Sequence, residues 1–230
     1  MSSAPLVAII LGAGANVGQH VSRAFAVKGY RIGLVARSLK EADSTADTVN
    51  ISADFSDPSS IVKAFDTTRN SLGSPSVVIY NAGAASANPA NDPLSLPLAD
   101  FTHDLSINTT SAFVAAQQAV LAFEGLPEHM PKTFIYTGNI LNTTSIPTLM
   151  SLGVGKSATA RMIESAATAY QDRGFRRVFY YCDERKVDGS AAYFDIDGPA
   201  HAEFYVHLAG AASQGPWQQT FVKNVGYKQF

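Results

Sequence analysis

The sequence is short of cysteine, of charge and of long apolar runs, and each shortage excludes a class of protein. With one cysteine, Cys182, neither an internal disulfide nor a cysteine metal cluster can form. No apolar run approaches the length of a membrane span, and no basic stretch precedes an apolar one near the N-terminus. Charged residues make up only 16% of the chain and the net charge is −2, with no basic stripe. These absences predict a cytoplasmic protein without a nucleic-acid or membrane partner.

Short apolar runs alternate with segments of helical periodicity along the 230 residues. The runs predict strands over 6–11, 32–36, 49–52, 76–80, 133–137, 177–181 and 219–222. The periodic segments predict helices from residue 17 onward and over 38–47, 57–72, 100–123, 151–172 and 200–211. Such alternation predicts one α/β domain over 1–230, with a doubly wound Rossmann-type parallel sheet of about seven strands. The charged, glycine-containing stretch 183–199 is predicted to be an excursion near a substrate pocket.

A glycine-rich turn follows the first apolar run and precedes the first helix. Gly12 allows a tight turn, Gly14 lets the backbone approach a pyrophosphate, and Gly18 lets the helix lie close to the strand. Val17 begins the helix, whose N-terminus offers free N–H groups and a partial positive charge to a phosphate. A purely structural glycine turn is the alternative, but the flanking strands favour nucleotide binding.

The spacing of several residues resembles the short-chain dehydrogenase/reductase superfamily over nearly the whole chain. Gly12-x-x-x-Asn16-x-Gly18 resembles the family's glycine motif, with Asn16 in place of the middle glycine. Because asparagine tolerates positive φ, we expect the turn to survive this replacement. The resemblance implies a strand order of 3-2-1-4-5-6-7. It also implies a homodimer or homotetramer formed through the helices at 100–123 and 151–172.

The resemblance also implies roles for residues beyond the glycine turn. Asp54 matches an adenine-contacting aspartate, and Asn81-Ala82-Gly83 matches a turn that stabilises the sheet beside the adenosine. Asn108 matches a helix asparagine that positions Lys156 through a water, and Lys156 matches the lysine that binds the nicotinamide ribose.

The end of the second predicted strand bears on the choice of cofactor. Family members that prefer NAD place an acid there, to accept hydrogen bonds from the ribose hydroxyls. Here the position holds Ala36, and Arg37 follows. A guanidinium suits a 2′-phosphate, so Arg37 predicts NADP rather than NAD. A surface arginine without a ligand is the alternative.

The family's proton-transfer residues are replaced. Relatives use a serine at the end of the fifth strand and a Tyr-x-x-x-Lys on the next helix, but Asn139 and Leu152 stand at the serine and tyrosine positions. Leucine cannot donate a proton. Asn139 either donates its amide N–H to a substrate oxygen or only closes the turn. Lys156 is a candidate acid, while the tyrosines at 136, 193 and 205 are weaker candidates that equally suit packing.

Acidic and histidine residues at 195–207 do not predict a metal site. His201 and Glu203 are two residues apart and would face different sides of a helix, and the segment better suits a helix cap followed by Pro199.

Two functions remain open. The first is an NADP(H)-dependent oxidoreductase acting on a small molecule, with a non-standard proton source: solvent, the substrate itself or Lys156. The second is a nucleotide-binding pseudoenzyme, or a redox-neutral enzyme that uses the same pocket. The retained Lys156 favours the first, because a protein that binds only the adenine end has little need of it.

Overall fold

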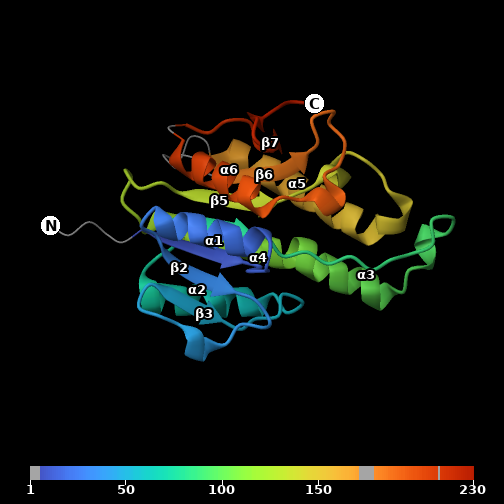
Figure 1. The fold of residues 1–230 in the computed structure, drawn as a ribbon. Helices are drawn as coiled ribbons and strands as arrows, with labels where there is room; N and C mark the ends of the chain where they lie inside the picture. Colours follow the sequence, from blue (N-terminus) through green and yellow to red (C-terminus); the bar gives the residue numbers. More distant parts are fainter. Residues whose placement is uncertain (1–5, 171–178, 212) are drawn as a thin grey trace.

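The computed structural model describes residues 6–170, 179–211 and 213–230, which build an eight-stranded sheet covered by helices on both faces (Figure 1). The strands are β1 Val7–Leu11, β2 Arg31–Val35, β3 Thr48–Ile51, β4 Val77–Tyr80, β5 Thr133–Thr137, β6 Phe179–Arg185, β7 Gln218–Val222 and β8 Gly226–Tyr227. Their order is β3-β2-β1-β4-β5-β6-β7-β8. The first seven run parallel, whereas β8 pairs antiparallel with β7.

The predicted doubly wound parallel sheet and its strand order are confirmed. The central strands form because their side chains are apolar on both faces: every residue of Val7–Leu11 is fully buried. The short β8 was not predicted, because Gly226 and Tyr227 form no apolar run.

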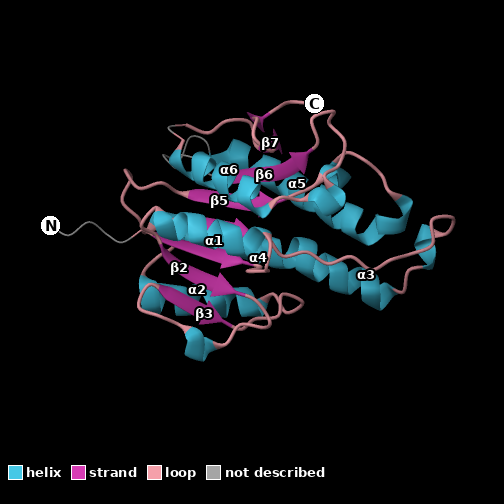
Figure 2. Cartoon of the chain, in the orientation of Figure 1, coloured by secondary structure: helices cyan, strands magenta, loops and turns pink. Residues whose placement is uncertain are grey.

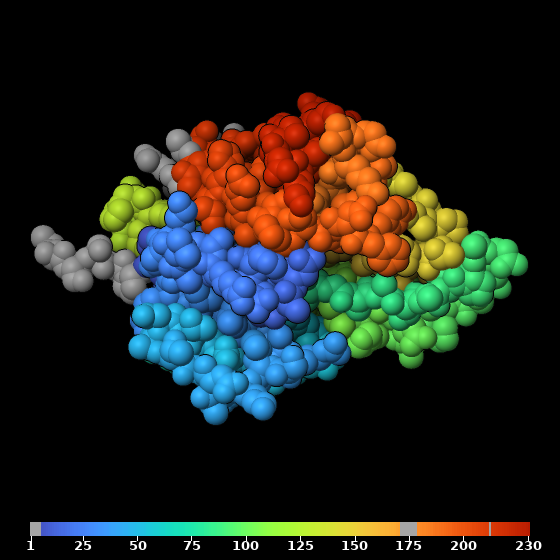
Figure 3. Space-filling model, in the orientation of Figure 1, coloured from blue at the N-terminus to red at the C-terminus, as the bar shows by residue number. Residues whose placement is uncertain are grey.

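Two helical layers cover the sheet. The helices are α1 Val17–Val27, α2 Ser59–Leu72, α3 Leu98–Leu105, α4 Ser111–Glu124, α5 Met150–Tyr170 and α6 Gly198–Gly210. One face packs on α1 and α6, which lie side by side although they are far apart in sequence (Figure 2, Figure 3). The other face packs on α2, α4 and α5.

The helix predicted over 100–123 is interrupted. Residues Ser106–Thr110 form a π-helical turn that joins α3 to α4, and Asn108 lies in it. Such turns insert an extra residue into the ladder of helical hydrogen bonds and are frequent at functional sites. The expected short helix over 38–47 is only a 3₁₀ turn at Glu41–Asp43. Within the described ranges, no helix has the combined length and apolarity needed to cross a bilayer.

The predicted boundary of the sixth strand and of the excursion at 183–199 is wrong. β6 continues through Arg185, and the connection to α6 covers only 186–197. Asp183, Glu184 and Arg185 are all at least nine-tenths buried, and each has a hydrogen-bond partner within the fold. A charged strand end looks like a loop in the sequence, because the partners that offset the cost of burying its charges come from other parts of the fold. Residues 177 and 178 of the predicted strand lie outside the described residues.

Candidate active site

Two cavities open at the carboxyl ends of the strands, where ligands of open α/β sheets bind. The glycine-turn cavity, about 380 Å³, lies among the ends of β1, β2, β3 and β4. The strand-end cavity, about 360 Å³, lies beyond β5 and β6.

The glycine turn depends on close approaches that only glycine permits. Gly12 has a φ of +100°, and a Cβ there would lie 2.5 Å from the backbone nitrogen of Ala82. A Cβ on Gly18 would lie 2.6 Å from the carbonyl oxygen of Gly12. By contrast, a Cβ on Gly14 would meet no heavy atom within 4 Å. Gly12 and Gly18 therefore allow close packing of the backbone, whereas Gly14 leaves its backbone accessible to a ligand.

The expectation that Asn16 takes up positive φ is wrong. Asn16 has φ −94° and ψ −98°, and its side chain instead reaches the start of α6. Its Nδ2 donates to the carbonyl of Ile196 at 2.9 Å, and its Oδ1 accepts from the N–H of Gly198 at 3.0 Å. Glycine at position 198 leaves room for these bonds, because a Cβ there would lie 2.5 Å from Asn16 Oδ1 and 2.9 Å from the backbone oxygen of Asn16. We call this pair of hydrogen bonds the Asn16 clamp.

The glycine-turn cavity gathers most of the predicted cofactor residues. Its walls include Gly12, Gly14, Arg37, Asp54, Asn81, Ala82 and Gly83. Asn81 joins two of the contributing loops, because its Nδ2 donates to the carbonyl of Gly12 at 2.8 Å. Val17 and Gly18 lie behind the wall as buried residues at the start of α1.

Two charged side chains lie at the rim of this cavity. Asp54 accepts a hydrogen bond from the Ser56 backbone N–H at 2.9 Å, and that bond is the largest cause of its lowered pKa. The cationic Arg37 also lowers the Asp54 pKa, by a smaller amount. Both side chains are exposed, so both are accessible to a ligand.

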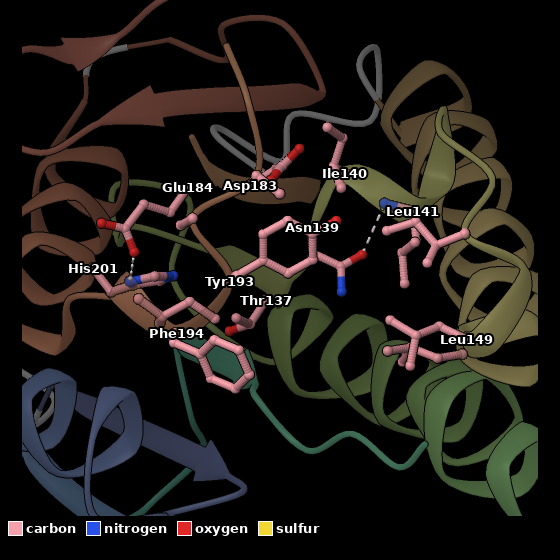
Figure 4. Close-up of a pocket in the computed structure, with 16 residues that line it drawn as sticks. Thr137, Asn139, Ile140, Leu141, Leu149, Asp183, Glu184, Tyr193, Phe194 and His201 are labelled. Atoms are coloured by element: carbon pink, nitrogen blue, oxygen red, sulfur yellow. Dashed lines mark hydrogen bonds and ion pairs between the residues drawn. The ribbon is translucent and has the colours of Figure 1, made fainter. Parts of the chain in front are cut away.

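The strand-end cavity has mostly apolar walls with polar groups at its base (Figure 4). Thr137, Gly138 and Asn139 line it at the end of β5, and Asp183 and Glu184 line it at the end of β6. Apolar side chains from the loop after β5, from α5 and from the loop after β6 complete it, among them Ile140, Leu149, Leu152 and Phe194.

Lys156 lies under the base of this cavity. Its Nζ donates to the backbone carbonyl of Thr137 at 2.8 Å and lies 4.4 Å from the centre of the Tyr136 ring. Burial lowers the Lys156 pKa to about 7, and the nearby carboxylate of Asp183 opposes that shift. The amine is therefore partly neutral near pH 7, a condition that an exposed lysine does not reach.

Asn139 and Leu152 both line the cavity. The Oδ1 of Asn139 accepts from the N–H of Leu141 at 3.0 Å, which leaves its Nδ2 facing the cavity (Figure 4). The hydroxyl of Tyr181 fixes the backbone of Asn139 by donating to its carbonyl at 2.7 Å. Leu152 lies one helical turn before Lys156 and contributes only an apolar surface.

Asn108 lines neither cavity, because its side chain is engaged in hydrogen bonds with the backbone after β4. Its Nδ2 donates to the carbonyl of Ala84 at 2.7 Å, and its Oδ1 accepts from the N–H of Ala84 at 3.1 Å. Its backbone carbonyl accepts from the hydroxyls of Tyr136 and Thr159. Asn108 thus anchors the chain after β4 to the π-helical turn.

Of the tyrosines considered as proton donors, only Tyr193 lines the strand-end cavity, and its side chain is 56% exposed. The hydroxyl of Tyr136 is buried, and that of Tyr205 is buried against Thr137 Oγ1 at 2.9 Å. Burial raises the pKa of both.

Sequence reasoning missed a group of buried ionisable residues. Asp183 accepts from Arg185 Nε at 2.5 Å, while Glu184 accepts from the N–H of Asp197 at 2.8 Å and lies 3.4 Å from His201 Nδ1. Burial raises the pKa of Asp183 to about 6 and of Glu184 to about 7, and it lowers the pKa of His201 to about 4. His201 is therefore neutral near pH 7, so its contact with Glu184 is not an ion pair. The charges were visible in the sequence, but their burial was not.

No group of three or more metal-ligating residues occurs in the part of the chain that the structure describes. His201 is buried beside Glu184 rather than facing Glu203.

The sheet order, the glycine turn and the two cavities at the strand ends define a Rossmann-type α/β protein. Residues 6–179 match the family model described as short chain dehydrogenase. The chain belongs to the short-chain dehydrogenase/reductase family.

Proteins that are similar in sequence belong to the same kind of enzyme by name. The short chain dehydrogenase/reductase dmxR12 of Cryptosporiopsis sp. is 43% identical over 239 residues, which cover 99% of this chain and 96% of that protein. The 2-(S)-hydroxypropyl-CoM dehydrogenase 3 of Xanthobacter autotrophicus is 24% identical over 178 residues, which cover 74% of this chain and 68% of that protein.

Solved structures share the fold. A metagenomic short-chain oxidoreductase in complex with NADP superposes with a TM-score of 0.80 at 16% identity, covering 98% of this chain and all of that one. A 3-oxoacyl-[acyl-carrier protein] reductase from Brucella melitensis in complex with NAD superposes with a TM-score of 0.78 at 14% identity, covering 96% of each chain.

Proposed function

We propose that the protein is an NADP(H)-dependent oxidoreductase with a degenerate catalytic tetrad of Asn108, Asn139, Leu152 and Lys156. The observation that carries this proposal is the glycine-turn cavity, which collects seven of the predicted cofactor residues in one hollow. The shape of this cavity suits the dinucleotide, because Gly14 leaves its backbone accessible and α1 begins beside the glycine turn, so that its N-terminus can face a phosphate.

NADP is the proposed cofactor because of the charge at the end of β2. Arg37 is exposed at the cavity rim, and the preceding Ala36 offers no carboxylate for ribose hydroxyls. A guanidinium binds a phosphate through two parallel hydrogen bonds, which an adenosine without the 2′-phosphate cannot accept. Asp54 and the turn at Asn81–Gly83 would enclose the adenosine.

Lys156 and Asn139 are proposed to act at the reacting end. The cofactor supplies a hydride when it is bound. Lys156 would hold the ribose from the base of the strand-end cavity, and Asn139 Nδ2 would donate a hydrogen bond to the substrate's polar atom. Leu152 supplies no proton, and general acid catalysis is typically worth ~10²–10⁴-fold. Without another acid in the cavity, reduction of plain ketones should be slow. An iminium or an activated alkene, which needs no strong acid, should react faster.

A homodimer or homotetramer is proposed from the surface of α4 and α5. Phe113 and Leu121 of α4 and Val154 of α5 are at least two-fifths exposed. Burying large apolar side chains of this kind favours association. Light scattering after size-exclusion chromatography measures the mass in solution, and a monomer would contradict the proposal.

Calorimetric titration with NADPH and, separately, NADH tests the cofactor assignment. Micromolar binding that prefers NADPH supports it, and a screen of imines, enones and quinones then follows the loss of NADPH absorbance. Turnover that Lys156→Ala abolishes supports the oxidoreductase. Binding without turnover across that screen would indicate the nucleotide-binding pseudoenzyme or a redox-neutral enzyme. Failure to bind either nucleotide would contradict the proposed function.

A further inference from the structure

One carboxyl oxygen in the strand-end cavity has no hydrogen-bond partner. Asp183 is 1% exposed, and its Oδ2 accepts from Arg185 Nε at 2.5 Å. Its Oδ1 is buried and unpaired within the described part of the chain, although the residue lines the cavity. A buried polar atom without a hydrogen-bond partner destabilises the fold. A ligand that forms a hydrogen bond with Oδ1 would remove this destabilisation.

The position of Asp183 on the sheet places it on the same face as Lys156. On β6, Phe179 and Tyr181 belong to the core beneath α4 and α5, whereas Tyr180 and Cys182 belong to the core beneath α1 and α6. By strand alternation, Asp183 shares the face of Tyr181, which is the face of Lys156. The mutual influence of Asp183 and Lys156 on their pKa values agrees with this placement.

The other groups of the cavity are poorly suited to give a proton. Leu152 carries none, and Tyr193 is half-exposed on the loop. Glu184 and His201 also line the cavity, but Glu184 belongs to the sheet face of α6, where its carboxyl accepts from the N–H of Asp197 and lies 3.4 Å from His201 Nδ1. The ionisable groups around Asp183 from its own and neighbouring elements are Arg185, Lys156, Glu184, Tyr181, Cys182 and Tyr205. Burial raises the pKa of the Tyr181, Cys182 and Tyr205 side chains, so these three remain neutral near pH 7.

We propose that Asp183 is a catalytic residue of the strand-end cavity, which exchanges a proton through Oδ1 with the oxygen of a compact, mostly apolar carbonyl compound. This inference rests on the proposed function and replaces solvent or Lys156 as the proton source. In the reduction, a C–H bond forms with the hydride that NADPH supplies, while the π bond of the carbonyl breaks toward oxygen. The O–H bond of Asp183 breaks, and its proton forms the hydroxyl of the product alcohol. The remaining carboxylate stays paired with Arg185 and regains a proton from solvent.

The surroundings suit both forms of this carboxyl. Arg185 and Lys156 stabilise the carboxylate that remains after transfer, whereas burial stabilises the acid that precedes it. The acid form is present in useful amounts because burial raises the Asp183 pKa to about 6, near the working pH of a general acid. The apolar walls from Ile140, Leu149 and Leu152 select for an apolar substrate.

The first test needs neither cofactor nor turnover. In the full chain labelled with ¹³C at aspartate carboxyls, we expect one resonance to titrate near pH 6 and to vanish in Asp183→Asn. If that resonance titrates below pH 4.5, Asp183 is not an acid at working pH and the proposal is wrong.

The second test compares Asp183→Asn with Glu184→Gln, the neighbouring carboxyl on the other face. With NADPH and a panel of cyclic ketones and aromatic aldehydes, wild-type reduction should fall by up to about tenfold per pH unit above pH 6. Asp183→Asn should lower kcat by ~10²–10⁴-fold and remove this dependence while NADPH binding stays within about twofold. The dependence should remain in Glu184→Gln.

The outcomes separate the two proposals. Intact turnover and pH dependence in Asp183→Asn would overturn the role of Asp183 and leave the oxidoreductase standing. A wild-type protein that binds no NADPH would overturn the proposed function, and the role of Asp183 with it. If Asp183→Asn does not fold, the wild-type protein still decides: a kinetic pKa that matches none of the aspartate carboxyl pKa values measured by NMR would overturn the proposal.

Discussion

Lys156 and Thr137 are joined by a hydrogen bond of 2.8 Å from the side-chain nitrogen to the backbone carbonyl at the end of β5. Both the ammonium and the neutral amine can donate this bond, so it positions Nζ without fixing its charge. The charge is set instead by burial, which lowers the Lys156 pKa to about 7, and by the opposing attraction of Asp183. The residue is thus held in place while its proton remains exchangeable.

This arrangement predicts a pH-dependent contribution of Lys156 to stability. The unfolded chain keeps the proton up to a pH near 10.5, whereas the folded chain releases it near 7. Between these values the unfolded state binds more protons, so the folded state gains stability as the pH rises, by up to about 1.4 kcal/mol per pH unit. Urea unfolding at pH 7, 8 and 9 should show this gain in the wild type relative to Lys156→Met. Exposed Lys63→Met is the control, and parallel curves for wild type and Lys156→Met would contradict the prediction.

The glycine turn predicts opposite effects for two matched substitutions. Gly18→Ala places a Cβ 2.6 Å from the carbonyl oxygen of Gly12 and should destabilise the fold by about 1–3 kcal/mol. Gly14→Ala meets no atom within 4 Å and should leave the free energy of unfolding nearly unchanged. The same substitution should weaken NADPH binding, because the methyl group occupies the approach to the backbone. Chemical denaturation and calorimetry on both variants measure the two effects, and equal loss of stability would show that Gly14 is a packing residue too.

Arg37 should determine the preference between NADPH and NADH. Hydrogen bonds to charged groups contribute about 1.5–3 kcal/mol each, so Arg37→Ala should lower NADPH affinity by roughly 10–100-fold. NADH affinity should change little, since NADH has no 2′-phosphate. Arg69, an exposed arginine paired with Asp66 on α2, provides the matched control through Arg69→Ala. An unchanged ratio of the two affinities would rule out the assignment.

The Asn16 clamp should protect the start of α6 from opening. Asn16→Ala removes a hydrogen-bond donor to the carbonyl of Ile196 and an acceptor for the N–H of Gly198, and the φ of −94° at this position is negative, so it does not require asparagine or glycine. We expect the amide of Gly198 to exchange with solvent at least tenfold faster, and the free energy of unfolding to fall by about 1–2 kcal/mol. Hydrogen exchange of the Val21 amide, in the middle of α1, is the internal reference. Unchanged exchange at Gly198 would mean that other contacts hold the segment.

Much of the architecture could be predicted from the sequence because its signals are local. Apolar runs such as Leu6–Leu11 and the glycines at 12 and 18 report directly on burial and close approach. The parallel sheet and its order followed from these signals and from the family resemblance. The residues at 37, 54 and 81–83, which the sequence predicts to bind the cofactor, follow strand ends, and the fold brings those ends together in one cavity.

The parts that could not be predicted depend on contacts between distant segments. Asp183 and Glu184 look like solvated loop residues until Arg185, Lys156 and His201 are placed around them. Asn16 was interpreted through its own backbone preferences, whereas its partners lie 180 and 182 residues away. The π-helical turn at Asn108 has no apolar period of its own.

The span of the Asn16 clamp has a consequence for synthesis of the chain. The glycine turn leaves the ribosome before its partner at Gly198, which follows about 180 residues later. At roughly 5–20 residues per second, that interval is about 10–40 s. During translation β1, β2 and α1 can pair and pack while the turn between them is unclamped. The glycine turn is therefore built first, and its two clamp partners arrive only with the start of α6.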